Sequence, residues 1–115
     1  MEIDQAFNFE YPIFSYLLEP GHRPGALRDS RTGMYYVPIW TERRLFDEFV
    51  ENFEFSGPIC GLQINDRYEL SNFLSRFDHP AITQVAIDPD AAPWNACELH
   101  NIEEIRRQCH PTKPR

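Results

Sequence analysis

Apolar residues occur along the chain in short blocks, separated by polar, proline and glycine residues. Ile13–Leu18 is an apolar run of strand length, and residues 34–40 are rich in aromatic and β-branched side chains, so both segments predict strands. Proline has no backbone N–H to donate to a neighbouring strand, so Pro38 is expected either at the end of the second strand or beside a sheet edge. Residues 22–33 contain glycine, proline and arginine and predict a long loop or a broad hairpin connection.

A helix is predicted after the second strand, with Thr41 as its N-cap. Its apolar positions recur at spacings of one, three and four residues and form one stripe, made of Leu45, Phe46, Phe49, Val50 and Phe53. The sequence Ser56-Gly57-Pro58 ends this pattern. The run Ile59–Ile64 then alternates only loosely, which is typical of a central strand that is buried on both faces.

Two further helices and one more strand are predicted in the second half of the chain. Asp66 and Glu69 form a capping-box-like start to a helix whose apolar residues recur at helical spacing, namely Leu70, Phe73, Leu74 and Phe77. Ile82–Ile87 is another buried run and predicts a strand, which the turn at residues 88–90 ends. Asn101 and Glu104 are placed to cap a short last helix that carries Ile102 and Ile105.

The order of elements predicts a single α/β (α+β-like) domain over residues 1–110, followed by a frayed tail at residues 111–115. Helical crossovers place the last three strands parallel, and the first strand is expected to pair antiparallel with the second. We therefore expect a small mixed, mainly parallel four-stranded sheet with two to three helices. The 115 residues, 42% of them apolar, are enough for one hydrophobic core and too few for two comfortable domains.

Charge and cysteine content narrow the class of protein. The formal net charge of -7 disfavours nucleic acid and anionic membranes as partners. No apolar run approaches the length of a membrane span and the amino terminus does not resemble a signal peptide, so a cytoplasmic protein is predicted. The three cysteines form no CxxC pair and predict free thiols. We predict no cofactor, because no glycine-rich phosphate loop and no Gly-x-Ser-x-Gly motif is found.

Residues 33–46, GMYYVPIWTERRLF, together with the later Ile87-Asp88-Pro89, resemble the SseB-like N-terminal domain family. In that family a Val-Pro-aromatic-Thr strand end leads into a helix, and a later buried strand ends in an Asn-Pro-like turn. Val37, Pro38 and Thr41 match this pattern, while Trp40 stands where Phe is usual and Asp88 where Asn is usual. The resemblance covers residues 13–90 and implies a mixed α/β fold in the bacterial cytoplasm, without an assigned activity or catalytic residues.

Two groups of residues suggest metal or thiol chemistry. Cys97, His100, Cys109 and His110 are all of metal-ligand type, but they lack the spaced second pair of a zinc motif, and adjacent residues on a helix end point about 100° apart. We therefore predict no metal at this group. Cys60 with His79 as its base would make a nucleophile, yet Cys60 lies in an apolar strand, where a cysteine is usually a small core residue.

Two other groups suggest binding. Asp66, Asp88, Asp90 and Glu98 could place carboxylates at the carboxyl ends of parallel strands, where α/β sheets bind ligands, although a helix cap and a turn explain the first three as well. Tyr35, Tyr36, Trp40 and Trp94 could form an aromatic interaction surface; alternatively, Tyr36 and Trp40 fill the core. Trp94 lies in a predicted loop, where a large aromatic residue either folds back as a plug or meets a partner.

These observations favour a non-catalytic, cytoplasmic protein-protein interaction or accessory domain, of adaptor or immunity-like type. The partner would be an unknown protein, and the negative net charge favours a basic one. We expect it to contact an acidic and aromatic surface made of Tyr35, Trp40, Asp88, Asp90 and Trp94. The alternative is a small-molecule-binding protein or small enzyme that uses carboxylates at the carboxyl edge of the sheet, with Asp66, Asp88, Asp90 and His79 around a cleft. A third hypothesis is a purely structural role, in which the chain forms an oligomer.

Overall fold

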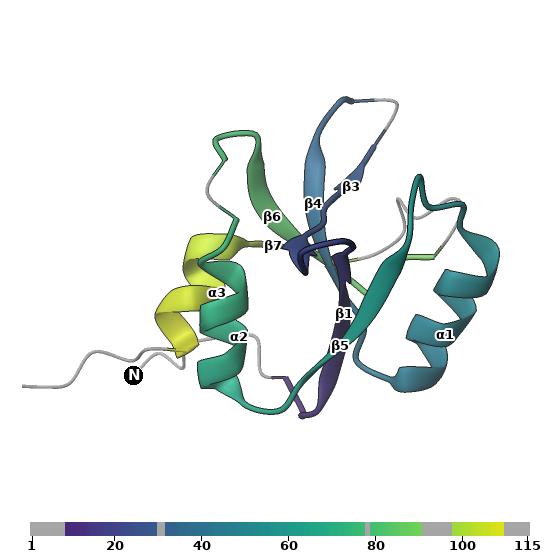
Figure 1. The fold of residues 1–115 in the computed structure, drawn as a ribbon. Helices are drawn as coiled ribbons and strands as arrows, with labels where there is room; N and C mark the ends of the chain where they lie inside the picture. Colours follow the sequence, from purple (N-terminus) through teal and green to yellow (C-terminus); the bar gives the residue numbers. More distant parts are fainter. Residues whose placement is uncertain (1–8, 30–31, 78, 91–97, 110–115) are drawn as a thin grey trace, which may run out of the picture.

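The computed structural model describes residues 9–29, 32–77, 79–90 and 98–109 (Figure 1). Within these ranges the elements follow the order β1 (Ile13–Leu18), β2 (Arg23–Pro24), β3 (Leu27–Arg28), β4 (Tyr35–Ile39), α1 (Arg43–Asn52), β5 (Ile59–Ile64), α2 (Arg67–Leu74), β6 (Ile82–Ile87), β7 (Glu98–Asn101) and α3 (Ile102–Cys109). The mixed α/β class is thereby confirmed. The predicted tail, residues 111–115, lies outside the described residues.

The strands form two sheets, and not the single, mainly parallel sheet that the sequence predicted. One sheet has the order β2-β1-β5 and is antiparallel throughout. The other has the order β3-β4-β6-β7, in which only β4 and β6 are parallel. The prediction was wrong because right-handed crossovers constrain only strands of one sheet, and α1 and α2 instead connect strands of different sheets.

Strand β5 is an edge strand, which corrects its predicted central position. It runs antiparallel to β1, with Ile13 opposite Ile64 and Leu18 opposite Ile59, so the first strand pairs with β5 and not in a ladder with β4. Ile64 packs in one hydrophobic cluster and Ile59 against the other. Of the residues of β5 only Ile64 is buried, and Gly61 and Gln63 are exposed, so the predicted burial of the strand on both faces was wrong.

The two sheets are joined where β1 passes the end of β4. Phe14 and Trp40 exchange two backbone hydrogen bonds of 2.8 Å each, which form an isolated antiparallel bridge. The buried hydroxyl of Ser15 donates to the carbonyl oxygen of Pro38 at 2.7 Å. These contacts hold the sheets together by directed polar bonds in addition to apolar packing.

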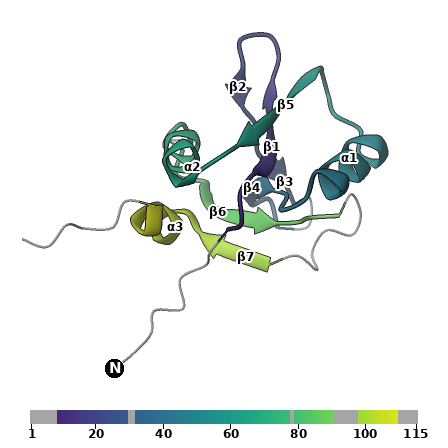
Figure 2. The same ribbon diagram turned by 90° about the horizontal axis from the view of Figure 1, so that it is seen from below.

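The ribbon places α1 on one side of β1 and β5, and α2 and α3 on the other (Figures 1 and 2). The buried residues form two hydrophobic clusters. The aliphatic core packs beneath α2 and α3 and comprises Ile13, Leu17, Val37, Ile39, Ile64, Leu70, Phe73, Leu74, Val85, Ile87, Ile102, Ile105 and Cys109. The aromatic core packs beneath α1 and comprises Phe14, Tyr16, Leu27, Trp40, Phe46 and Phe49. Successive residues of β1 alternate between the two cores, as side chains of a strand must.

The helix starts agree with the sequence in two cases and differ in one. The side chain of Asp66 accepts the backbone N–H of Glu69 at 2.9 Å, and Asn101 accepts those of Glu103 and Glu104, so both predicted caps are confirmed. Thr41 does not cap α1: the N-cap is Glu42, without a side-chain cap bond. Among the described residues, no helix is long and apolar enough to cross a membrane.

The segment between β1 and β4, predicted as a long loop or a broad hairpin connection, contains two short strands. It contributes β2 to the first sheet and β3 to the second, so it crosses from one sheet to the other. Gly25 lies at the crossing and is buried; a Cβ atom there would come within 2.6 Å of the Tyr16 ring. Glycine is therefore required because the backbone approaches a core aromatic ring too closely for any side chain.

Candidate functional site

Asp88 and Asp90 follow β6, at the carboxyl ends of the parallel strands β4 and β6. The backbone N–H of Asp88 donates to the carbonyl oxygen of Ile39 at 2.8 Å. Its carboxylate accepts two bonds from Thr41, one from the backbone N–H at 2.7 Å and one from the hydroxyl at 2.8 Å. The residue adopts a left-handed φ of 54°, which aspartate tolerates better than most residues. Asp88 therefore ties the end of β6 to the chain that enters α1.

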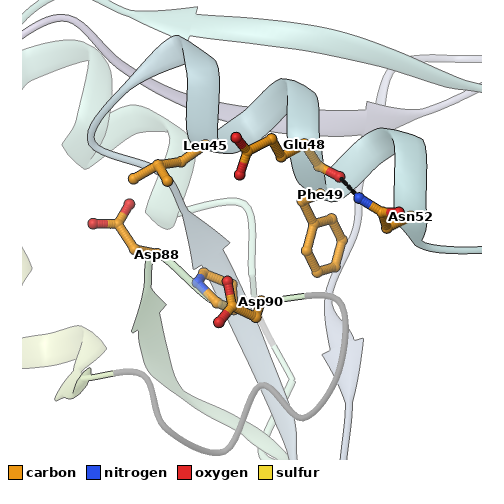
Figure 3. Close-up of a pocket in the computed structure, with 7 residues that line it drawn as sticks. Leu45, Glu48, Phe49, Asn52, Asp88 and Asp90 are labelled. Atoms are coloured by element: carbon orange, nitrogen blue, oxygen red, sulfur yellow. Dashed lines mark hydrogen bonds between the residues drawn. The ribbon is translucent and has the colours of Figure 1, made fainter.

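A small hollow of about 80 Å³ lies between this turn and α1 (Figure 3). We call it the acidic hollow; it is lined by Leu45, Glu48, Phe49, Asn52, Asp88, Pro89 and Asp90. Glu48 joins the two aspartates from α1, which sequence reasoning missed because nothing in the local pattern of a helix indicates which loop its polar face will meet. Asp90 is exposed and Asp88 half-buried.

The electrostatics of the acidic hollow are negative. Glu48 is 59% exposed and its carboxylate is 3.4 Å from Arg44, which also contacts Glu42, so the charge of Glu48 is only partly compensated. Asp88 accepts both of its hydrogen bonds from the neutral donors of Thr41, which carry no charge that would compensate its carboxylate. The hollow has no basic residue among the described residues that line it. Its walls therefore favour a cationic group.

Trp40 supports this site from inside the protein, which corrects its predicted place on a partner-binding surface. Its side chain is 0% exposed, and its ring lies 4.8 Å from that of Phe49 and 5.3 Å from that of Phe46. Its indole N–H donates to the carbonyl oxygen of Pro89 at 3.0 Å. Trp40 thus fills the aromatic core, the alternative considered from the sequence, and it holds the backbone between Asp88 and Asp90.

The other predicted binding residues that the structure describes do not line the acidic hollow, although Glu98 lies at the same edge of the sheet as Asp88. Tyr35 is half-buried in β4 and Tyr36 is buried, and neither lines the acidic hollow. Glu98 lies at the start of β7, opposite Ile87 in the register. Trp94 falls within residues 91–97, outside the described residues.

The alternative cleft predicted from Asp66, Asp88, Asp90 and His79 does not form. Asp66 is used as the cap of α2. His79 precedes β6 and accepts the backbone N–H of Ala81 at 3.1 Å, so it lies at the opposite end of that strand from Asp88. The sheet topology therefore gathers Asp88 and Asp90 only.

Of the four Cys and His residues near the carboxyl terminus that were considered as metal ligands, the structure describes only His100 and Cys109. Cys109 is buried in the aliphatic core at 4% exposure, and burial raises the pKa of its thiol. His100 is half-buried in β7. Cys97 and His110 lie outside the described residues. A thiol with a raised pKa among apolar side chains behaves as a core residue.

A second, larger hollow of about 550 Å³ lies beside the chain that enters β1. It is lined by Phe9, Glu10, Tyr11, Pro12, Phe14, Thr41, Glu42 and Arg43. Burial, followed by the charges of Cys109 and Asp66, raises the pKa of Tyr11 to about 12. The phenol therefore stays neutral at physiological pH and is available there as a hydrogen-bond donor.

Comparison with known proteins adds no family to this picture. Neither a model of a protein family nor a curated protein matches the chain.

Proposed function

We propose that the chain is a non-catalytic, cytoplasmic protein-binding domain of adaptor or immunity-like type, and that the acidic hollow receives a Lys or Arg side chain of its partner. The observation that carries the proposal is the set of three carboxylates, those of Glu48, Asp88 and Asp90, around a hollow without a basic lining residue among those described. The net charge of -7 and the resemblance to the SseB-like family, which has no assigned chemistry, support the same function.

The shape of the acidic hollow fits the end of a side chain. Leu45, Phe49 and Pro89 offer apolar surface for the methylene stem of Lys or Arg. The exposed carboxylates at the rim can accept charge-assisted hydrogen bonds from the head group. Its volume of about 80 Å³ is well below the roughly 300–1,000 Å³ of small-molecule sites, so the side chain of a protein partner is favoured over a complete small ligand.

The contact area of a partner must extend beyond this hollow. Trp94 follows Asp90 closely in the sequence, and Tyr35 lies on β4, the strand parallel to β6. We propose that Trp94 supplies an aromatic contact to the partner; Tyr35, opposite Ile82, lies at the other end of β4 from the hollow. Exposed aromatic residues next to carboxylates are typical of interfaces with cationic segments.

The test is a quantitative pull-down from native lysate with three single variants. Asp90→Lys and Glu48→Lys reverse charges at the hollow, and Glu51→Lys makes the same change on an exposed position of α1 that does not line it. We expect a partner that is captured by the wild-type protein and by Glu51→Lys but reduced at least about tenfold by each hollow variant. Capture should also decrease as the salt concentration rises.

The partner must then bind as a purified protein through a basic segment, whose Lys or Arg residues are replaced in turn. The Trp94→Ala variant reports on the proposed aromatic contact. A partner that binds all three charge variants equally, or no partner above background, would contradict the proposal.

The larger hollow supports a second candidate function, the binding of a small molecule. Its volume of about 550 Å³ lies within the range of ligand sites, and Tyr11 and Arg43 have donor groups at its wall. A thermal-shift screen of metabolites is the test, with Arg43→Ala as the site variant and Arg23→Ala as the control outside the hollow. A hit whose stabilisation is lost only in Arg43→Ala would support ligand binding at this place.

A further inference from the structure

Three side chains that can bind a metal meet at the end of the first sheet. They are the carboxylate of Glu19, the imidazole of His22 and the thiol of Cys60, and one ligand atom of each lies within 4.8 Å of the others. The His22 Nε2 atom and the Glu19 Oε2 atom are already 3.3 Å apart. None of the residues lines the acidic hollow. The sequence paired Cys60 with His79; the structure places His22 and Glu19 beside Cys60 instead.

The strand register brings Glu19 and Cys60 to one face of the sheet. Leu17 is the register partner of Cys60, and the backbone N–H of Glu19, just past β1, donates to the carbonyl oxygen of Pro58 at 3.0 Å. Glu19 lies two residues after Leu17, so its side chain and that of Cys60 point to the same side. A diagonal pair of this kind is within reach of long side chains.

The turn after β1 brings the third ligand to the same side. Gly21 and His22 both have left-handed φ angles, of 94° and 51°, which reverse the chain within a few residues. The carbonyl oxygen of His22 accepts a hydrogen bond of 2.6 Å from the guanidinium of Arg76, which follows α2. The backbone of His22 is therefore held in place, while its imidazole, at 65% exposure, is free to adjust.

We propose that Glu19, His22 and Cys60 form a zinc-binding site. Thiolate, imidazole and carboxylate are the three ligand types that Zn²⁺ uses in proteins, and three protein ligands leave the fourth tetrahedral position open to water or to another ligand. Zinc-ligand bonds of about 2.0–2.3 Å correspond to distances of roughly 3.3–3.8 Å between ligands. Glu19 and His22 already satisfy this range, and rotation of exposed side chains closes the remaining gap to Cys60.

The charges near the site agree with a divalent cation. Bound Zn²⁺ with one thiolate and one carboxylate is neutral overall, so no further counter-ion is required. Arg23 is the nearest basic residue in the turn, and its guanidinium donates to the carbonyl oxygens of Pro20 and Glu19 at 3.1 and 3.5 Å. The arginines therefore brace the backbone of the turn and leave the Glu19 carboxylate to the metal.

Zinc at this place would connect the turn after β1 to β5, in addition to the strand pairing. Metal binding that requires the folded register stabilises the folded chain, because the unfolded chain holds no such arrangement. The open fourth position would also make the metal accessible to a ligand from solvent. This inference does not depend on the acidic hollow or on a protein partner.

The experiment is a titration of the reduced, untagged full-length chain with Co²⁺ and then with Zn²⁺ in competition. We expect one Zn²⁺ per chain and a sulfur-to-cobalt charge-transfer absorption that Zn²⁺ abolishes. Cys60→Ser should remove this absorption, and His22→Asn and Glu19→Gln should each weaken zinc affinity by more than about tenfold. Added Zn²⁺ should raise the melting temperature of the wild-type chain but not that of Cys60→Ser.

Matched controls are Cys97→Ser and His79→Asn, which change the same residue types outside the proposed site. Both should keep the absorption and the affinity of the wild-type chain, and circular dichroism checks that every variant is folded. An absorption that persists in Cys60→Ser, or that disappears in Cys97→Ser instead, would overturn the assignment. Zinc uptake well below one equivalent by the folded wild-type chain would overturn it as well.

Discussion

The two hydrophobic cores differ in what their side chains can do besides packing. The aliphatic core beneath α2 and α3 consists mainly of Ile, Leu and Val, whose contribution is the removal of apolar surface from water. The aromatic core beneath α1 contains Trp40, whose ring is packed among aromatic rings while its N–H donates to Pro89. Both cores hold the fold together, and the aromatic core also positions the turn at residues 88–90, which lines the acidic hollow.

This difference explains why the candidate binding site lies on one side of the molecule. Phe49 belongs to the aromatic core and also forms part of the acidic hollow. Pro89 is bonded to Trp40 and separates the two aspartates of the hollow. A change in the aromatic core should therefore affect both stability and partner binding, whereas a change in the aliphatic core should affect stability alone.

Removal of the Trp40 side chain should have the largest effect. Trp40→Ala leaves a cavity in the aromatic core and is expected to lower the free energy of unfolding by about 3–5 kcal/mol. Trp40→Phe keeps most of the packing and loses the bond to Pro89, at a cost of roughly 1–3 kcal/mol. Urea unfolding measures both. If Trp40→Phe binds the partner as the wild-type chain does, the indole bond does not position the hollow.

A comparable deletion in the aliphatic core should separate stability from binding. Leu70 is 0% exposed in α2, and Leu70→Ala is expected to cost about 2–5 kcal/mol. Partner binding, measured by calorimetry well below the melting temperature, should remain unchanged, because α2 does not line the hollow. A weaker affinity in this variant would show that the two cores are coupled.

The bond between the two sheets should have an intermediate effect. Ser15→Ala removes the hydroxyl that donates to Pro38 and leaves a buried carbonyl oxygen without this donor, at a cost of roughly 1–2 kcal/mol. Ser71→Ala is the control, since Ser71 is also buried but lies in α2, where alanine is the better helix former. Equal effects in urea unfolding would mean that the link between the sheets contributes little.

The smallest effect on stability is expected from the ionisation of two tyrosines at alkaline pH, one beside each core. Burial and the charges of Cys109 and Asp66 raise the pKa of Tyr11, beside the aliphatic core, to about 12, and burial raises that of Tyr16, in the aromatic core, further. Because the folded pKa exceeds the unfolded value of 10.0, the stabilisation is complete below about pH 10 and is lost as the pH rises through the folded value.

The melting temperature of the wild-type chain should therefore decrease from about pH 10, the unfolded pKa, towards about pH 12, the folded pKa of Tyr11. Tyr11→Phe should reduce this decrease, whereas Tyr35→Phe, at a half-buried position outside both cores, should not. An ultraviolet titration should show Tyr16 ionising after Tyr11. Ionisation in the reverse order would contradict the difference between the two environments.

The sequence determined the local elements with high precision. The predicted strands Ile13–Leu18, Ile59–Ile64 and Ile82–Ile87 are observed with the same bounds, and each predicted helix is present. Such elements follow from periodicity and from breakers such as Gly57-Pro58, which act over a few residues. β7 was missed because Glu98–Asn101 is largely polar and becomes a strand by pairing with β6.

Only the tertiary structure decided which elements meet. Periodicity predicted burial on both faces of Ile59–Ile64, but it did not show that Ile64 packs in one core and Ile59 against the other. It also did not show that Gly61 and Gln63 are exposed. For the same reason the sequence left Trp40 between surface and core and gave no reason to join Glu48 to Asp88. It favoured a core position for Cys60, which the structure leaves half-buried beside Glu19 and His22. The pattern of apolar side chains along the chain predicts that a residue is buried. Which residues it contacts depends on the packing of segments that are distant in the sequence.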